Sequence, residues 1–433
     1  NYNLTLSSSD NIGVSYYQID VDGNGTADSN INSNWIPENG FHSHNVRFRA
    51  VDHAGNVSAW TSNQHIHMDT EKPTFTTWWW GETGSIVNRL YIRVTDNASG
   101  INRVQCPTST ASGNYNNWHW YNAVWDSSAN AYRCDITPST FDHYGQNYTV
   151  HLYMYDNVGN GGYYNNTSIS IPSVVCSVNN SKYSTLQSCV DSSDGSIIRL
   201  LSNVNLTSSL VIPSGKNVTM YLQNHTISSS VTNAVILNYG TLTIGGQNVN
   251  DSGNIISSTA GQAIASSGTL YIWSGNYSST HSAVLNNGGT LAVASGTFKA
   301  KTGLGMNCGE TTILGGTFQA TEWDGISLWS DCEGSSKLYY EKATTIGINY
   351  GLYLSKNVNV TINGGSITSK NTGIYSAASS GEINIYKGET PETTISGNTF
   401  ALYAVDGTNV YYHGGTLNCA SGSGLNCIHA RNY

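Results

Sequence analysis

Charged residues are scarce in this chain of 433 residues, because Asp, Glu, Lys and Arg together make up 10% of it against about 25% in an average domain. Proline is also scarce, with 7 residues. No apolar run approaches the roughly 20 residues of a membrane span. These absences exclude a collagen-like protein, a coiled coil and a transmembrane helix. The net charge of -9 offers no basic surface to a phosphate backbone, so nucleic acid is not expected as a partner.

Glycine, tyrosine and tryptophan, in contrast, are plentiful, with 45, 28 and 11 residues. A chain this rich in aromatic residues and this low in net charge is expected to fold. Its polar surface must consist mostly of Asn, Ser, Thr and Tyr, which favour strands and turns over long helices. The composition therefore predicts an all-β protein. The chain starts without an initiator Met or a signal peptide and ends without a wall-sorting signal, so we expect a segment of a longer protein.

The eight cysteines are even in number and fall into consecutive pairs, each within one structural unit. We expect four disulfides: Cys106–Cys134, Cys176–Cys189, Cys308–Cys332 and Cys419–Cys427. The alternative is free thiols in a cytosolic protein, and no Cys or His spacing typical of a zinc site occurs. Disulfides form in oxidising compartments, so the pairing favours an extracellular protein, secreted or on the cell surface.

Residues 1–70 alternate apolar and polar positions between Gly and Asn turns, which predicts a small antiparallel β-sandwich. The stretch Ala50–Ser58, with the sequence AVDHAGNVS, resembles the closing strand and turn of bacterial Ig-like domains found in secreted and surface proteins. The resemblance implies a spacer or display module without catalytic residues, which could be truncated here.

The same segment contains one candidate calcium loop, in which acids and an amide alternate along the chain. The candidate ligands are Asp20, Asp22, Asn24 and Asp28. Ile31 stands where such a loop has a bidentate Glu. Because Asp-Gly and Asn-Gly are also strong hairpin signals, the sequence favours a plain turn, and no cofactor is required.

Residues 71–172 again contain strand-like stretches, among them the aromatic run Trp118–Tyr121. The last of them runs into Asp156–Asn160, which repeats the Asp52–Asn56 ending of the first segment. Together with Asp96–Ile101 near its start, this segment resembles the Bsp-like repeat of Gram-positive surface proteins and wall hydrolases. The resemblance implies a non-catalytic β-sandwich.

Three consecutive tryptophans, Trp78, Trp79 and Trp80, stand near the start of this second segment. Successive strand side chains point to opposite faces, so the three cannot all enter one core. At least one must pack on a neighbouring domain or meet solvent, and interdomain packing is favoured over a ligand platform.

Residues 173–433 contain an internal repeat. A short apolar element recurs every 20–29 residues, around Val235, Ile264, Val284, Leu304, Ile326, Leu352, Ile374, Leu402 and Ile428. Several repeats continue with a second apolar element and then with a Gly-Thr-Phe or Gly-Ser-Ile element. Two or three short strands per repeat are typical of a parallel β-helix. Cys308 and Cys332 lie about one repeat apart and would staple neighbouring coils.

The stretch Tyr183–Val190, just before the repeat, has helical spacing, with Ser184 as the candidate N-cap. We expect a short helix that closes the open end of the coils. Val211–Thr219 and Leu222–Ile227 resemble the first coil of pectate-lyase-like β-helix regions in bacterial surface proteins. The expected fold is therefore two Ig-like β-sandwich domains followed by a right-handed parallel β-helix with a short N-terminal capping helix.

Acidic residues of the repeat concentrate at one place, where Glu322, Asp324, Asp331 and Glu333 are interleaved with Trp323 and Trp329. Paired carboxylates can act as acid and base, and an aromatic ring can stack on a sugar. The candidate ligand-binding residues are Glu322, Trp323, Asp324 and Trp329. The pattern nevertheless favours a loop of exposed acids whose Trp rings pack on neighbouring turns. The signatures of pectin-cleaving hydrolases are missing, and we assign no catalytic residue.

These features together predict a bacterial surface protein for cell adhesion or display, which binds a glycan or another protein without catalysis. An uncharged polar face of the β-helix would supply many hydrogen bonds at a lower desolvation cost than charges would. Two alternatives stay open. One is a polysaccharide-active enzyme centred on Glu322 and Asp324, and the other is a structural subunit that self-associates into an extracellular fibre.

Overall fold

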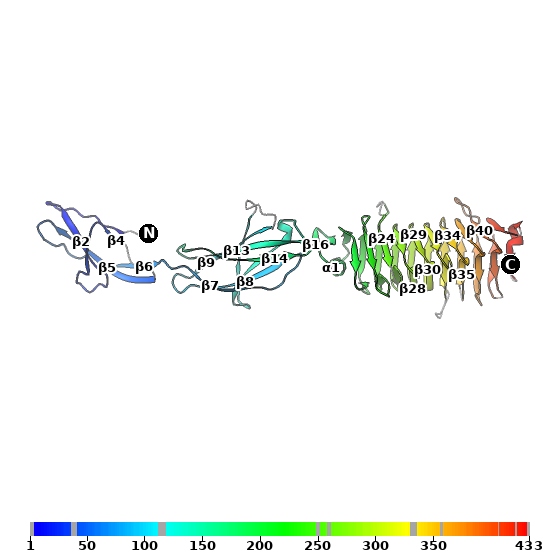
Figure 1. Ribbon diagram of the computed structural model, residues 1–433, viewed down its shortest axis with the longest axis horizontal. Helices are drawn as coiled ribbons and strands as arrows, with labels where there is room; N and C mark the ends of the chain where they lie inside the picture. The colour runs from blue at the N-terminus through cyan, green and yellow to red at the C-terminus, as the bar shows by residue number, and fades with distance from the viewer. Residues whose placement is uncertain are drawn as a thin grey trace. The chain divides into compact units, whose positions relative to one another are not determined.

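The computed structural model describes residues 4–35, 41–110, 118–247, 252–257, 261–329, 336–355, 358–405, 407–420 and 422–430. These residues form an all-β structure with one short α-helix, as the composition predicts. The chain divides into two compact units, Asn1–Pro172 and Ser173–Tyr433, coloured from blue to cyan-green and from green to red in Figure 1. Within the described ranges, no helix has the length and apolar character that crossing a membrane requires.

The first part of unit 1 is a four-stranded antiparallel sheet in the order β3-β2-β5-β6, with a two-stranded ribbon β1-β4. The strands are β1 (Leu4–Thr5), β2 (Val14–Asp20), β3 (Ser29–Ile31), β4 (Asn34–Trp35), β5 (Phe41–Asp52) and β6 (Gln64–Asp69). Ile19, Val46 and Phe48 form its small buried core. The predicted antiparallel β-structure is confirmed, and the Ig-like identity of this part stays a prediction.

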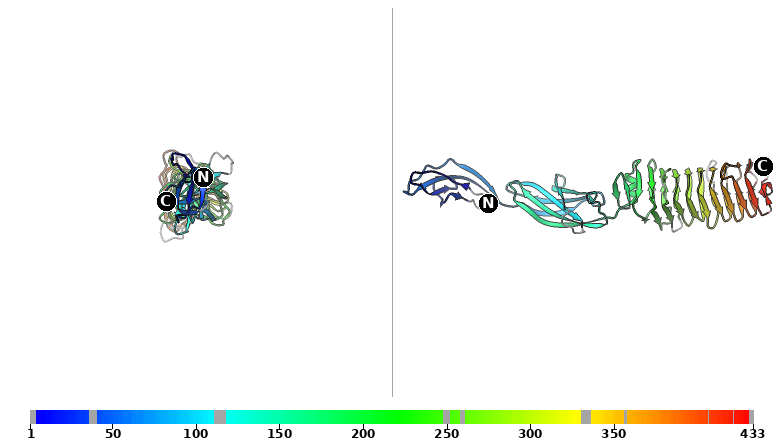
Figure 2. Two further views of the ribbon diagram at one scale, coloured as in Figure 1. Left: turned by 90° about the vertical axis from the view of Figure 1, so that its left-hand side faces the viewer. Right: turned by 90° about the horizontal axis from the view of Figure 1, so that it is seen from above.

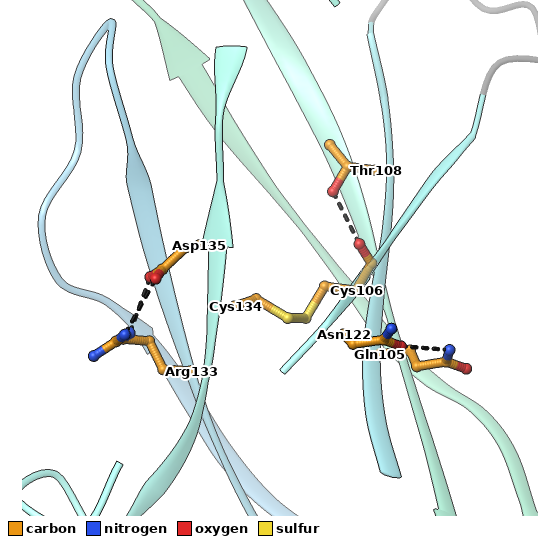
Figure 3. The surroundings of a disulfide bond; sticks show 7 residues. All are labelled: Gln105, Cys106, Thr108, Asn122, Arg133, Cys134 and Asp135. Carbon is orange, nitrogen blue, oxygen red and sulfur yellow. Dashed lines mark hydrogen bonds and ion pairs between the residues drawn. A yellow bond between two sulfur atoms is a disulfide. The ribbon is translucent and has the colours of Figure 1, made fainter. Parts of the chain in front are cut away.

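The second part of unit 1 is a β-sandwich of two four-stranded sheets, β10-β9-β13-β14 and β11-β12-β8-β7, around a shared core. Its elements are β7 (Thr74–Trp80), β8 (Asn88–Thr95), β9 (Ile101–Thr110), β10 (His119–Asn122), β11 (Val124–Asp126), β12 (Ala131–Ile136), the 3-10 turn η1 (Pro138–Thr140), β13 (Gln146–Asp156) and β14 (Gly161–Ile171). Cys106 of β9 and Cys134 of β12 form the predicted disulfide, which joins the two sheets across the core (Figure 3).

The repeated Asp-to-Asn ending occurs as the same turn in both parts of unit 1. Asp52 and Asp156 each accept hydrogen bonds from the backbone N–H groups two and four residues further on. The side chains of Asn56 and Asn160 donate to the second oxygen of the same carboxylate. The glycine before each Asn has a positive φ, 89° at Gly55 and 97° at Gly159. Residues other than glycine rarely adopt such values.

The three consecutive tryptophans divide between the two faces of β7. Trp78 and Trp80 pack against the sandwich core. Trp79 lies on the opposite face and stacks on Tyr91 of β8, with 5.2 Å between ring centroids and 7° between ring planes. Arg93 covers the same ring at 5.1 Å. The described contacts of Trp79 are therefore with its own sheet, and packing on a neighbouring domain stays a prediction.

Unit 2 is a parallel β-helix whose coils stack one on the next (Figures 1 and 2). The larger of its two sheets contains β15 (Cys176–Val178), β16 (Ser181–Tyr183), β17 (Ile197–Leu200), β19 (Leu210–Ile212), β20 (Asn217–Tyr221), β22 (Ile236–Asn238), β23 (Thr241–Ile244), β25 (Ile264–Ser266), β26 (Thr269–Ile272), β28 (Ser282–Val293), β30 (Thr302–Ile313), β32 (Ile326–Leu328), β33 (Ser336–Tyr340), β35 (Tyr350–Leu354), β36 (Val358–Ile362), β38 (Thr372–Ser376), β39 (Gly381–Ile385), β41 (Phe400–Ala404), β42 (Asn409–Tyr412) and β45 (Ile428–His429).

The smaller sheet of unit 2 takes one strand from each coil and ends in the antiparallel pair β43–β44. It contains β18 (Val204–Leu206), β21 (Thr226–Ser229), β24 (Asn254–Ser257), β27 (Asn276–Ser278), β29 (Thr297–Ala300), β31 (Thr317–Ala320), β34 (Thr344–Gly347), β37 (Ser366–Ser369), β40 (Thr394–Gly397), β43 (Thr416–Cys419) and β44 (Gly422–Ser423), which is followed by the 3-10 turn η2 (Gly424–Cys427). Tyr277, Phe298 and Phe318 stack inside the coils at centroid distances of 4.9 and 4.6 Å.

The predicted repeat agrees with the strand register at every position but one. From Ile264 to Ile428, the predicted apolar residues of successive coils pair with one another directly. At the first position, Ile236 rather than Val235 pairs with Ile264. Both residues are fully buried, so the apolar pattern could not distinguish them.

The predicted capping helix is α1 (Leu186–Ser192), but its N-cap is Thr185 and not Ser184. Thr185 is extended, and its side-chain oxygen accepts a hydrogen bond from the backbone N–H of Ser188 at 3.2 Å. The Cys176–Cys189 and Cys419–Cys427 disulfides are confirmed. Cys332 lies outside the described residues, so Cys308–Cys332 stays a prediction.

Candidate functional site

Glu322 and Trp323 lie in the turn that joins β31 to β32, on the outside of the coil. Lys301 and His281 come from the equivalent turns of the two preceding coils. The Nζ atom of Lys301 is 2.8 Å from Oε2 of Glu322 and 5.2 Å from the centroid of the Trp323 ring. His281 meets that ring edge-on at 5.5 Å. Trp323 stays 37% exposed, so this surface presents a ring flanked by both signs of charge.

Asp324, the next residue, is buried instead of exposed, with 9% of its surface accessible. Ser327 of β32 donates its hydroxyl to Oδ2 of Asp324 at 2.7 Å. The Oδ1 atom is buried, and none of the described residues gives it a hydrogen bond. Burial raises the pKa of this carboxyl, because the charged form loses hydration that the bonds from the Ser327 hydroxyl and the Tyr350 backbone replace only in part.

The structure therefore gives the two candidate carboxylates different surroundings. Glu322 is exposed and paired with Lys301, whereas Asp324 is buried and bonded to Ser327. An acid–base pair must act on one substrate bond from two sides. No described contact joins the two groups, and Asp331 and Glu333 lie outside the described residues.

Trp329, the fourth candidate residue, directly follows β32. A Cβ atom placed on Gly305 of β30 would be 2.7 Å from the Trp329 ring, so the ring packs closely over that glycine. Its backbone N–H donates to the carbonyl oxygen of Met306. These contacts are with the preceding coil, as expected for a packed tryptophan, and they do not bring Trp329 to Trp323.

A polar groove with a volume of about 490 Å³ runs across the coils where β27, β29, β31 and β34 begin, and extends to Ser252 just before β24. Its lining consists of Ser, Thr, Asn and Gly residues, with Lys342 as a charged member. Asn276, Thr297, Thr317 and Thr344 line it in register, because each pairs with the next across the sheet. The groove was not predicted from the sequence, although the recurring Gly-Thr-Phe triplets lie along it.

Glycines at the coil corners keep this groove open. Gly275, Gly296 and Gly316 have φ values of 112°, 129° and 101°. A Cβ atom on Gly316 would also come within 3.0 Å of the carbonyl oxygen of Gly296. Side chains are therefore disfavoured at these corners both by conformation and by space.

The predicted calcium ligands Asp20, Asp22 and Asp28 do converge, with one oxygen of each within 4.8 Å of the others. Asp20 is already engaged, because Nη2 of Arg47 lies 2.6 Å from its Oδ2 atom. Burial alone would raise the pKa of Asp20, but the bond from Arg47 and those from nearby backbone groups lower it to about 2. The Nδ2 atom of Asn24 donates a hydrogen bond to Oδ2 of Asp22 at 2.8 Å. A hairpin turn neutralised by Arg47 accounts for this geometry, and calcium binding stays a prediction.

A second set of carboxylates lies in the described part of unit 1. One oxygen of each of Asp69, Asp96 and Asp156 lies within 4.8 Å of the others. Asp69 and Asp156 are buried and Asp96 is partly exposed. Oxygen ligands of this kind could hold a hard cation such as calcium. This group could not be predicted from the sequence, because its members end or follow three different strands.

No protein-family model matches this chain, and no curated protein matches it either. Among solved structures, pectate lyase Pel3 from Pectobacterium carotovorum is 12% identical, with a TM-score of 0.19 and coverage of 83% of this chain and 99% of that chain. Pectate lyase PelI from Erwinia chrysanthemi, in complex with tetragalacturonic acid, is 13% identical, with a TM-score of 0.17 and coverage of 82% and 96%. TM-scores this low support no conclusion about activity. The β-helix is assigned from the strand pairing within unit 2.

Proposed function

We propose that this chain belongs to an extracellular surface protein of bacterial type, which binds a glycan along its β-helix and does not cleave it. The polar groove is the observation that carries the proposal. The disulfides support an oxidising compartment outside the cytosol. On this proposal the two modules of unit 1 are Ig-like and Bsp-like spacers that display the β-helix.

The groove offers hydrogen-bonding groups at a regular spacing. Thr297, Thr317 and Thr344 stand one above the other on neighbouring strands, which lie about 4.8 Å apart in a β-sheet. Within the described ranges, no protein group bonds to their hydroxyls, and each hydroxyl can both donate and accept. A glycan chain also repeats its hydroxyl groups along its length, so it can meet several coils with the same contact.

The electrostatics of the groove favour a neutral glycan over a polyanion. Lys342 is the charged residue among its lining. Its Nζ atom lies 3.1 Å from Oε1 of Glu341, which offsets much of its charge. Uncharged hydroxyls also lose less hydration free energy on binding than charged groups do.

Binding without cleavage is supported by the surroundings of Glu322 and Asp324. Glu322 is held by Lys301 on the surface, and Asp324 is enclosed beside Ser327. Neither carboxylate lines the groove. The groove borders the start of β31, whereas both acids follow its end.

A glycan array probed with the full chain tests the proposal. Replacing Thr297 and Thr317 together by Val removes two hydroxyls at constant shape, and we expect glycan affinity to fall at least tenfold. Thr361→Val on β36 is the matched control, because this Thr lies on the other sheet. We expect it to bind as the unchanged chain does.

Three results would contradict the proposal. The first is a chain that binds no glycan, and the second is a groove variant that binds as well as the control. The third is the release of new chain ends from uronate or neutral glycans, abolished by Glu322→Gln, which would establish the enzyme instead.

A further inference from the structure

Five rings gather on one sheet face of the 71–172 sandwich, and we name them the ring cluster: Trp118, Trp120, His151, Tyr153 and Tyr163. They come from β10, the residue before it, β13 and β14. On β13, His151 and Tyr153 alternate with Val150, Leu152 and Met154, which are fully buried in the core. The ring cluster therefore lies on the face of the sheet that points away from the core.

The rings of the cluster form one continuous set of contacts. Trp118 lies 4.3 Å from His151, and His151 lies 5.2 Å from Tyr163. Tyr163 lies 5.7 Å from Tyr153, which lies 5.1 Å from Trp120. Burial lowers the pKa of His151, which favours its neutral form. The cluster is thus an aromatic surface whose one imidazole is biased towards the uncharged state.

The outer members of the cluster are open to solvent. Trp120 is 48% and Tyr163 50% exposed. A sandwich does not need large rings on its outer face for stability, because its core is already formed by the inward residues. Exposed aromatic groups that lie together mark binding surfaces more often than isolated ones do.

Amide groups border the rings. Gln105 donates from Nε2 to Oδ1 of Asn122 at 2.8 Å, on the side of β9 away from the disulfide (Figure 3). Gln105 lies directly opposite Tyr153 on the neighbouring strand. This bond leaves the Gln105 carbonyl oxygen and the Asn122 N–H groups available to a ligand. Asn166 in turn donates to the hydroxyl of Tyr163 at 3.0 Å.

We propose that the ring cluster binds a neutral polysaccharide, at a second site distinct from the groove of the β-helix. The C–H face of a pyranose ring is apolar and packs on Trp and Tyr rings, while its equatorial hydroxyls reach sideways to amides. The cluster and its border supply both parts of this arrangement and contain neither an acid nor an aliphatic side chain. An aliphatic centre is typical of the buried part of a protein interface, so a protein partner or a second copy of the chain fits less well.

Retention of the full chain on insoluble cellulose and chitin tests this proposal. We expect the chain to be retained, and Trp120→Ala and Tyr163→Ala each to weaken retention at least tenfold. Trp125→Ala is the matched control, because Trp125 is 53% exposed on the opposite sheet of the same sandwich. It should be retained as the unchanged chain is. An unaltered thermal midpoint would show that each variant is folded.

The proposal is overturned if neither polysaccharide retains the chain, or if both Trp120→Ala and Tyr163→Ala are retained as well as Trp125→Ala. It is also overturned if sedimentation shows that the unchanged chain is a dimer and that Trp120→Ala is a monomer. A second copy of the chain would then occupy the ring cluster. The Thr297→Val/Thr317→Val groove variant separates the two proposals. We expect it to lose array glycans that Trp120→Ala still binds, and to keep the retention on insoluble polysaccharide that Trp120→Ala loses.

Discussion

Asp324→Asn should stabilise the protein at neutral pH and leave its stability unchanged in acid. Burial raises the pKa of Asp324 above the ordinary value of 3.8, so the folded state holds the proton more tightly than the unfolded state does. The contribution of Asp324 to stability is therefore greatest below pH 3.8 and is lost as the pH rises through the raised pKa. Asparagine at this position has no charge to bury, and its carbonyl oxygen can still accept the hydroxyl of Ser327.

The gain comes from the charge, because Asp324 must bury a carboxylate at pH 7 and asparagine does not. Each unit by which burial raises the pKa of a carboxyl destabilises the charged form by about 1.4 kcal/mol. We therefore expect Asp324→Asn to raise the free energy of unfolding by on the order of 1 kcal/mol at pH 7 and by nothing measurable at pH 3. Urea unfolding of the full chain at both pH values, comparing the midpoint of the same transition, measures the difference.

A matched control is Glu322→Gln, two residues earlier. Glu322 is 51% exposed and pairs with Lys301 at the surface. Such surface pairs contribute about 0–1 kcal/mol, so this variant should change the midpoint little at either pH. A variant Asp324→Asn that is less stable than the unchanged chain at pH 7, or more stable by the same amount at both pH values, would refute the reasoning.

Three further predictions concern the stability of the two units. Phe318→Ala empties a stacked position inside the β-helix and should cost about 3–5 kcal/mol by urea unfolding, so a loss below about 1 kcal/mol would mean that the coils close over the gap. Replacing Cys106 and Cys134 by Ser releases the two sheets and should cost about 2–4 kcal/mol, a difference that a reducing agent should abolish. Arg47 and nearby backbone groups hold the pKa of Asp20 at about 2, below its ordinary 3.8, so this carboxylate stabilises the fold above about pH 4 and loses that effect as the pH falls toward 2. Thermal midpoints of the unchanged chain and Asp20→Asn between pH 5 and 2 should converge, and parallel curves would count against this assignment.

The β-helix was the part of the fold most open to prediction. Its coils repeat, so each buried apolar residue predicts its partner one coil away, and from Ile264 to Ile428 these predictions match the register. The failure at Val235 has a local cause, since Val235 and Ile236 are both buried where the chain turns into the strand. The prediction of the helix N-cap failed for a similar reason. Ser184 and Thr185 are both good N-cap residues, and only the backbone conformation selects Thr185.

The candidate site was predicted only in part. Glu322 and Trp323 are surface neighbours in one turn, as adjacent residues must be, but Lys301 and His281 join them from other coils. The exposure of Asp324 was predicted wrongly, because a turn sequence does not say which of its side chains points inward. The groove and the ring cluster were not predicted from the sequence, because each is assembled from strands that are far apart along the chain.

Composition and periodicity by themselves determined that this protein is made of strands, that its second half winds into coils, and which cysteines pair at three places. These properties depend on short-range spacing, which the order of residues records directly. Only the tertiary structure decided that Asp324 is enclosed, that threonines of three coils line one groove, and that five rings share one face. Such groupings depend on strand register and on the direction of each side chain, and the packing of the whole unit sets both.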